Sequence, residues 1–112
     1  MSDPSPDDPV AVLDLGDGRD ASAAASVGDR IEIRVHAPGG TGYEWELNAG
    51  DGRCRVVSRD VSFDEATFGG AGIARFVVEA TAGGTADLRL SLQAPWEKQP
   101  ARTLRVSVKV AE

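Results

Sequence analysis

Few side chains in this 112-residue sequence are of the types that do covalent chemistry. His36 is the only histidine and Cys54 the only cysteine, whereas nucleophilic catalysis needs a base and an orienting group beside the nucleophile. His36 falls on the polar side of an alternating segment, which favours a solvated side chain. Cys54 is expected to be a buried or half-buried structural thiol. Neither residue has carboxylates at the spacing of a zinc site, so we expect no catalytic residue, no metal site and no cofactor.

The glycine-rich segment Gly39-Gly40-Thr41-Gly42 has the composition of a phosphate cradle. A P-loop would also need a lysine and a hydroxyl at the start of a following helix, and here Tyr43-Glu44-Trp45 begins a predicted strand instead. Two interpretations stay open: a simple turn, or a narrow loop that enters a cleft because glycines leave little side-chain bulk.

A second unusual segment is Ala94-Pro95-Trp96, which follows a run of alternating leucines. Pro95 ends the strand ladder, because proline has no N–H to donate. An exposed aromatic side chain on a loop next to proline is typical of a binding anchor. The sequence therefore favours a contact surface at Trp96 over a side chain that caps the core.

Alternating apolar and polar residues recur along most of the chain, as in Ile31, Ile33 and Val35 or Leu88, Leu90 and Leu92. This period of two predicts strands with one buried and one solvated face. Glycine and proline turns separate the strands, and we interpret the Ala/Ser run 21–26 as an extended connection. The prediction is an all-β fold, an immunoglobulin-like antiparallel β-sandwich of about seven strands. The predicted strands are 10–15, 29–36, 43–48, 53–61, 73–80, 85–92 and 102–110.

In such a sandwich, successive loops alternate between its two ends. The three longer loops, 37–42, 62–72 and 93–101, are therefore expected to share one end. They also contain the unusual segments described above, which indicates a scaffold that presents a loop surface.

Composition limits the partners and the organisation of the chain. Of the formal net charge of −6, residues 1–28 carry −5, so the acidity belongs mostly to the start of the chain. We expect a disordered acidic tail at residues 1–9 and a single immunoglobulin-like domain at 10–112. An acidic chain without a long apolar stretch predicts no nucleic-acid and no membrane partner, and we expect a monomer. The N-terminus lacks signal-peptide features, so the chain is cytoplasmic as written, or exported if a signal was removed.

The three loops together resemble the chagasin (I42-type) family, whose members inhibit papain-like cysteine proteases. The family has three motifs in order: an Asn-Pro-Thr-Thr-Gly-Tyr-like loop, a Gly-x-Gly-Gly loop and an Arg-Pro-Trp loop. Thr41-Gly42-Tyr43 is similar to the end of the first, Gly69-Gly70-Ala71-Gly72 to the second and Ala94-Pro95-Trp96 to the third. The sequence departs from the family at Pro38-Gly39-Gly40, at Ala71 and at Ala94, which stands where the family usually has arginine.

The resemblance implies a reversible, steric inhibitor that is not an enzyme. Its protease-binding residues would be Gly39, Gly40, Thr41, Gly42, Tyr43, Gly69, Gly70, Ala71, Gly72, Ala94, Pro95 and Trp96. Thr41 and Gly42 would enter the active-site cleft, the second loop would lie beside it, and Trp96 would pack on its far side. Tyr43 and Trp45 would mainly support the first loop. One alternative is a non-inhibitory immunoglobulin-like binding module of the cell surface or periplasm. The other is an enzyme, but the sequence contains no set of residues that could act together in catalysis.

Overall fold

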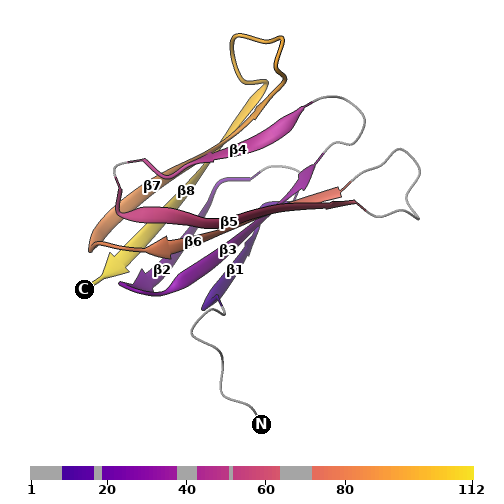
Figure 1. Cartoon of the computed structure of the whole chain (residues 1–112). Coiled ribbons are helices and arrows are strands. Elements are labelled where there is room, and N and C mark those ends of the chain that lie inside the picture. The colour runs from indigo at the N-terminus through magenta and orange to yellow at the C-terminus, as the bar shows by residue number, and fades with distance from the viewer. Residues whose placement is uncertain (1–8, 17–18, 38–42, 51, 64–71) are drawn as a thin grey trace.

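Strands make up the regular structure of the residues that the computed structural model describes, which are 9–16, 19–37, 43–50, 52–63 and 72–112. Eight strands follow one another in this part of the chain (Figure 1): β1 Ala11–Asp14, β2 Ala21–Ser26, β3 Arg30–Ala37, β4 Glu44–Asn48, β5 Cys54–Phe63, β6 Gly72–Ala80, β7 Gly84–Gln93 and β8 Arg102–Ala111. The predicted all-β fold is confirmed. All but the last residue of the predicted tail at 1–9 lies outside the described residues.

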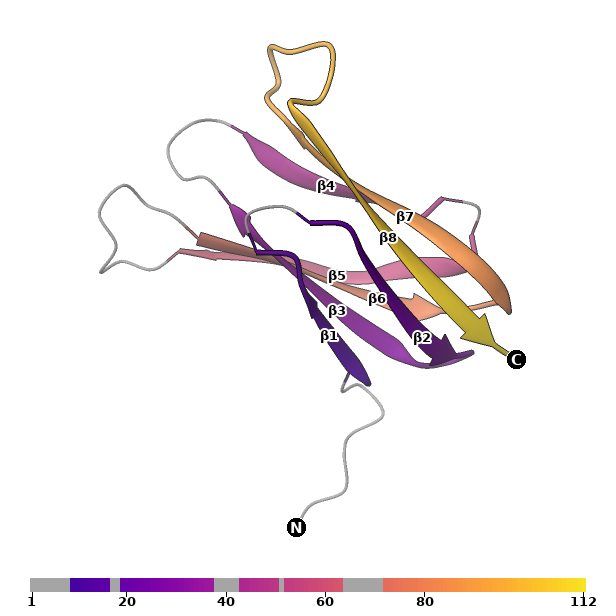
Figure 2. The ribbon, with the colours of Figure 1, turned by 180° about the vertical axis from the view of Figure 1, so that it is seen from behind.

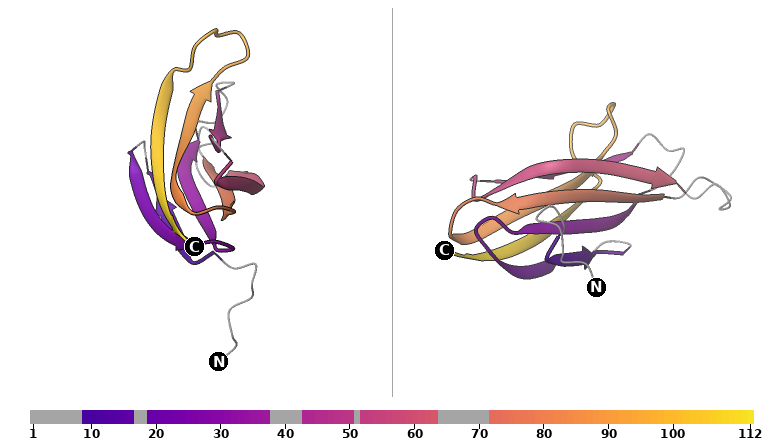
Figure 3. Two further views of the ribbon diagram at one scale, coloured as in Figure 1. Left: turned by 90° about the vertical axis from the view of Figure 1, so that its left-hand side faces the viewer. Right: turned by 60° about the horizontal axis from the view of Figure 1, so that its bottom comes forward.

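The strands form two four-stranded sheets that pack face to face as a sandwich (Figure 2). One sheet has the strand order β1-β3-β6-β5 and the other has the order β2-β8-β7-β4. The two layers are seen from the side in Figure 3. The chain changes sheet after each of β1, β2, β3, β4 and β6, so neither sheet is built from one continuous stretch of sequence.

Side chains from the inner faces of both sheets meet in one core. In the β3–β6 ladder, Ile31 lies opposite Val78 and Ile33 opposite Phe76. The facing sheet contributes a matching row, in which Leu88 and Leu90 on β7 are fully buried. Burying an aliphatic side chain of this size stabilises a fold by about 1.5–3 kcal/mol. The apolar residues at alternate positions therefore supply most of the packing that holds the two sheets together.

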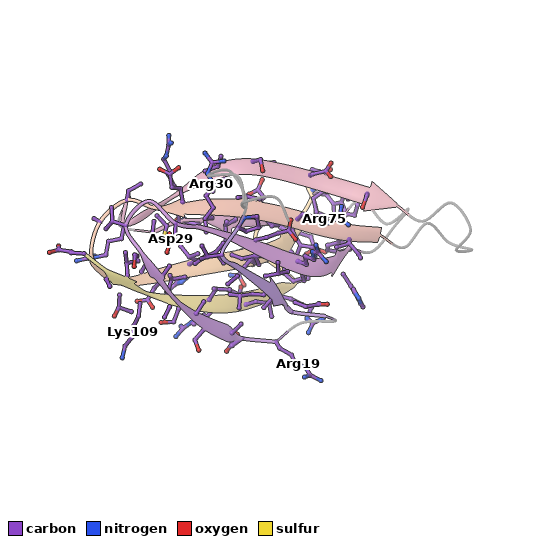
Figure 4. All side chains as sticks on the ribbon, turned by 90° about the horizontal axis from the view of Figure 1, so that it is seen from below. Arg19, Asp29, Arg30, Arg75 and Lys109 are labelled. Atoms are coloured by element: carbon purple, nitrogen blue, oxygen red, sulfur yellow. The ribbon has the colours of Figure 1, made fainter. Side chains whose placement is uncertain are left out.

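Charged side chains cover the outer faces. Arg30 on β3 and Arg55 on β5 each lie 3.5 Å from a carboxylate oxygen of Glu79 on β6, the strand between them. Figure 4 shows Arg30 and Arg75 on this sheet and Lys109 on the other. Ion pairs at a protein surface contribute about 0–1 kcal/mol each, so these pairs favour register and solubility more than stability.

The run 21–26, which we expected to be a connection, forms the additional strand β2. Its residues alternate between half-buried and exposed, with Ala21, Ala23 and Ala25 packed against the core and Ser22 and Ser26 in solvent. Alanine and serine differ too little in hydrophobicity for this alternation to stand out in the sequence. The sandwich therefore has eight strands where the sequence predicted about seven.

The strand directions also differ from the expected antiparallel sandwich in two places. β1 pairs with β3, and β2 pairs with β8, and both ladders are parallel. Alternation along a strand shows which face is buried and carries no information about the direction of the neighbouring strand. The remaining ladders, which include every strand next to the three long loops, are antiparallel.

Candidate functional site

The strand ends that flank the three long loops meet at one end of the sandwich. In one sheet, Ala37 at the end of β3 and Phe63 at the end of β5 both lie opposite Gly72, the first residue of β6. In the other sheet, Gln93 at the end of β7 lies opposite Glu44 at the start of β4. These registers place the strand ends that flank the loops as expected, while residues 38–42 and 64–71 lie outside the described residues. We call this end of the sandwich the loop end.

Several predicted site residues lie outside the described residues: Gly39, Gly40, Thr41, Gly42, Gly69, Gly70 and Ala71. Their roles stay predictions. The residues that flank them are described, and both are half-buried: Tyr43 directly before β4 and Gly72 at the start of β6.

Trp45 braces the two strands that carry the first loop. Its side chain is buried, and its Nε1–H donates a hydrogen bond of 2.9 Å to the backbone oxygen of His36. This bond ties the start of β4 to the end of β3 across the two sheets. The prediction that Trp45 supports the base of this loop is confirmed.

The segment 94–101 is held by its own hydrogen bonds. The Glu97 N–H donates to the Ala94 oxygen at 3.0 Å, and the Ala101 N–H donates to the Leu92 oxygen at 2.7 Å. The side chain of Gln93 adds a bond of 2.8 Å from its Nε2 to the Glu97 oxygen. These bonds hold the segment as a compact projection beyond β7 and β8, which Figure 1 shows above the ends of both strands.

Trp96 is the most exposed large hydrophobic residue among those described, with 66% of its surface accessible. Its ring meets that of Tyr43 edge to face, with centroids 6.0 Å apart and an interplanar angle of 69°. Edge-to-face contacts of this kind are favourable because the positive edge of one ring meets the negative face of the other. Trp96 thus stands in solvent while one side of it rests on a half-buried tyrosine.

Tyr43 also joins the first loop to the third through its hydroxyl group. The Tyr43 O–H donates a hydrogen bond to a carboxylate oxygen of Glu97. This bond raises the pKa of Tyr43 above its ordinary value, and partial burial and the negative charge of Glu97 add to the effect. Glu97 was not among the predicted site residues, because nothing in its spacing distinguishes it from other acids on polar segments.

Ala94 requires a correction. The resemblance placed it among the residues that contact the protease, but its side chain is only 1% exposed. It follows β7 directly and continues the inward alternation of Leu90 and Leu92, so it turns toward the interior while Pro95 and Trp96 face solvent. Ala94 therefore shapes the base of the segment, and arginine at this position would have to leave that interior.

A cavity of about 140 Å³ opens beside the loop end, between β4 and the β5–β6 side of the other sheet. Tyr43 and Trp45 form part of its wall, so the aromatic residues that support the first loop also border a hollow. The other lining residues are Ala37, Glu44, Arg59, Val61 and Ala74.

The candidates for covalent chemistry lie apart from one another. Cys54 is buried at the start of β5, as expected for a structural thiol, and His36 is exposed at the end of β3. Within the described ranges, no group of three metal-ligating side chains comes together. The same residues contain no helix long and apolar enough to cross a membrane.

Residues 24–110 match the family described as Chagasin family peptidase inhibitor I42. The chain belongs to this family. The match spans most of the sequence and all strands from β3 to β8. The resemblance inferred from the three loop motifs is confirmed, and the chain is a peptidase inhibitor and not an enzyme. No curated protein sequence matches the chain.

Several solved structures share the sandwich. The cysteine protease inhibitor EhICP2 from Entamoeba histolytica superposes with a TM-score of 0.73 at 23% identity, covering 90% of this chain and 96% of that one. Amebosin gives a TM-score of 0.69 at 21% identity, over 93% and 100% of the two chains. PbICP-C, solved in complex with falcipain-2, gives 0.60 at 18% identity, over 89% and 98%. At these identities the likeness establishes the fold.

Proposed function

We propose that the chain inhibits papain-like cysteine proteases by placing its loop end in the active-site cleft as a reversible, steric plug. As a chagasin-family protein it is an inhibitor of this protease class. The proposed part is the binding mode: the loop that contains Thr41 and Gly42 enters the cleft, and the loops around Gly69–Gly72 and Trp96 lie on its two sides.

The exposure of Trp96 is the observation that carries this proposal. A tryptophan that is 66% exposed is costly to leave in water, and here it stands on a segment fixed by backbone hydrogen bonds. Rigid aromatic side chains of this kind bury a large area at a small entropic cost when a partner covers them. PbICP-C, whose fold this chain shares, was solved in complex with a cysteine protease, falcipain-2, which supports the class of partner.

The mechanism needs no reacting group on the inhibitor. Glycine-rich backbone fits a narrow cleft because it carries little side-chain bulk, and bulk added at Gly42 would obstruct entry. Access of substrate to the enzyme's cysteine is blocked while the inhibitor is bound, and the enzyme recovers when it dissociates. The binding free energy therefore comes from non-covalent contacts.

The experiment is a titration of papain and a cathepsin L-type enzyme with the purified chain. We expect competitive inhibition, recovery of activity on dilution, and an inhibitor that remains uncut after prolonged incubation. A serine protease such as trypsin is the matched control and should keep its activity. Inhibition that persists after dilution, or cleavage of the chain within 38–42, would contradict a reversible steric plug.

A further inference from the structure

One acidic side chain, Glu97, links the first and third loops. Tyr43 comes directly after residues 38–42 of the first loop, and its hydroxyl group donates a hydrogen bond to the Glu97 carboxylate. Two hydrogen bonds hold the Glu97 backbone: its N–H donates to the Ala94 oxygen, and its carbonyl oxygen accepts from the Gln93 side chain. A carboxylate held in this way gives Tyr43 a stationary acceptor.

We propose that Glu97 is a positioning residue of the inhibitor, which fixes Tyr43 and, through the Tyr43 ring, the exposed side chain of Trp96. Tyr43 and Trp96 then approach the protease as one preformed aromatic surface. This inference rests on the proposed function, because it assigns a role to a residue of the same surface.

The geometry explains why a positioning residue is useful here. Trp96 is largely in solvent, and the edge-to-face contact with Tyr43 is the ring contact that restrains its indole. The Tyr43 ring is itself restrained by the bond from its hydroxyl group to Glu97. Ordering a side chain before binding removes an entropic cost from association. Loss of the acceptor on residue 97, as in Glu97→Ala, should therefore weaken inhibition by roughly three- to tenfold, the size of ordering one flexible side chain.

The contact can be measured without any protease. Tyr43 is the only tyrosine in the sequence, so the absorbance change of phenolate formation reports on this residue alone. Glu97 stabilises the neutral phenol that donates the bond, so the contact is intact at neutral pH and is lost as the pH rises through the raised pKa. In Glu97→Ala the pKa of Tyr43 should fall toward its ordinary value. Glu97→Gln, which keeps an acceptor oxygen and loses the charge, should give an intermediate value.

The functional part uses inhibition constants for papain. We expect Glu97→Ala and Tyr43→Phe to weaken inhibition by the same factor, because each removes one partner of the same bond. Glu97→Gln should inhibit nearly as well as the unaltered chain. In a Trp96→Ala background, Glu97→Ala should cost less than about twofold, because the side chain that it positions is gone.

The outcomes separate the two proposals. If the unaltered chain fails to inhibit papain, the proposed function fails, while the tyrosine titration still tests the contact. If the chain inhibits but Glu97→Ala leaves either the pKa of Tyr43 or the inhibition constant unchanged, the positioning role is overturned. Full additivity with Trp96→Ala would also overturn it, since Glu97 would then act through its own contact with the protease. Glu46→Ala, at an exposed glutamate on β4, controls for the loss of charge and should change neither measurement.

Discussion

At one end of the sandwich, backbone hydrogen bonds tie neighbouring turns together, while at the other the strand ends hold an exposed aromatic pair. At the first, which we call the turn end, the Gly28 N–H donates to the Ala80 oxygen at 2.8 Å. The Thr81 N–H donates to the Arg53 oxygen at 2.8 Å. Gly28 and Gly84 adopt φ values of +95° and +118° there, in the left-handed region that suits glycine. At the loop end, Tyr43 and Trp96 meet in partial contact with solvent.

The difference indicates a division of work between the ends. Bonds between turns restrict the backbone and contribute to the free energy of unfolding, and their donors and acceptors are not available to a partner. An exposed tryptophan contributes little to that free energy and offers a large apolar area for binding. Substitutions at the turn end should therefore change stability and leave inhibition intact. Substitutions of exposed side chains at the loop end, such as Trp96, should weaken inhibition and leave stability nearly unchanged.

The largest effect on binding is expected from Trp96→Ala. Removing the exposed indole should cost about 2 kcal/mol or more of binding free energy, the range of an interface hot spot, or roughly 30-fold in the inhibition constant. The melting temperature should stay nearly unchanged, because the side chain is largely exposed in the free protein. Trp45→Phe is the opposite control: it removes the bond to the His36 oxygen and should lower the melting temperature. An unchanged inhibition constant for folded Trp96→Ala would refute the assignment.

The buried base of the segment 94–101 at the loop end is tested by Ala94→Arg. The family resemblance suggests that arginine would keep or improve affinity, but Ala94 is 1% exposed, so a long cationic side chain would displace its neighbours. We expect the free energy of unfolding to fall by about 1–3 kcal/mol, measured by denaturant titration. Ala94→Ser is the control of small volume and should cost less. Tighter inhibition together with unchanged stability would return this position to the binding surface.

At the turn end, Gly84→Ala should destabilise without weakening inhibition. The backbone there has a φ of +118°, and a Cβ would lie 2.7 Å from Nε of Arg53, whose bond to the Gly83 oxygen would be disturbed. The expected loss is about 1–2 kcal/mol, or roughly 4–12 °C in the melting temperature. Gly28→Ala isolates the conformational part, because a Cβ there meets open space. A weaker inhibition constant for folded Gly84→Ala would show that the two ends are coupled.

Much of this architecture could be predicted from the sequence. Burial of one face of each strand imposes an alternation of apolar and polar residues, and this alternation is visible in the sequence. Ile31, Ile33 and Val35 are buried as that period requires. The strand β2 escaped notice because alanine and serine have similar hydrophobicity. The parallel ladders escaped notice because the period carries no information about direction.

The candidate site was predictable only where a residue type is unusual for its place. Trp96 after Pro95 stood out, and its exposure agrees with the prediction. Glu97 did not, since its role depends on a hydrogen bond to Tyr43, 54 residues away in the sequence. Ala94 was misplaced because a motif gives the order of residues and not the direction in which each side chain points.

The smallest expected effect in this comparison belongs to Cys54→Ser at the start of β5, on the turn end. The thiol is 2% exposed and belongs to the core, so a hydroxyl group in its place carries a desolvation cost. We expect a loss of about 1 kcal/mol in the free energy of unfolding and the same inhibition constant as the unaltered chain. Cys54→Ala is the matched control, because it removes the sulfur without adding a polar group. A steric inhibitor does not use its own thiol. Inhibition should therefore also survive when the inhibitor is treated with a thiol-blocking reagent that is removed before the protease is added. If folded Cys54→Ser lost inhibition, the cysteine would take part in the mechanism, and neither the steric plug nor the division between the two ends would stand.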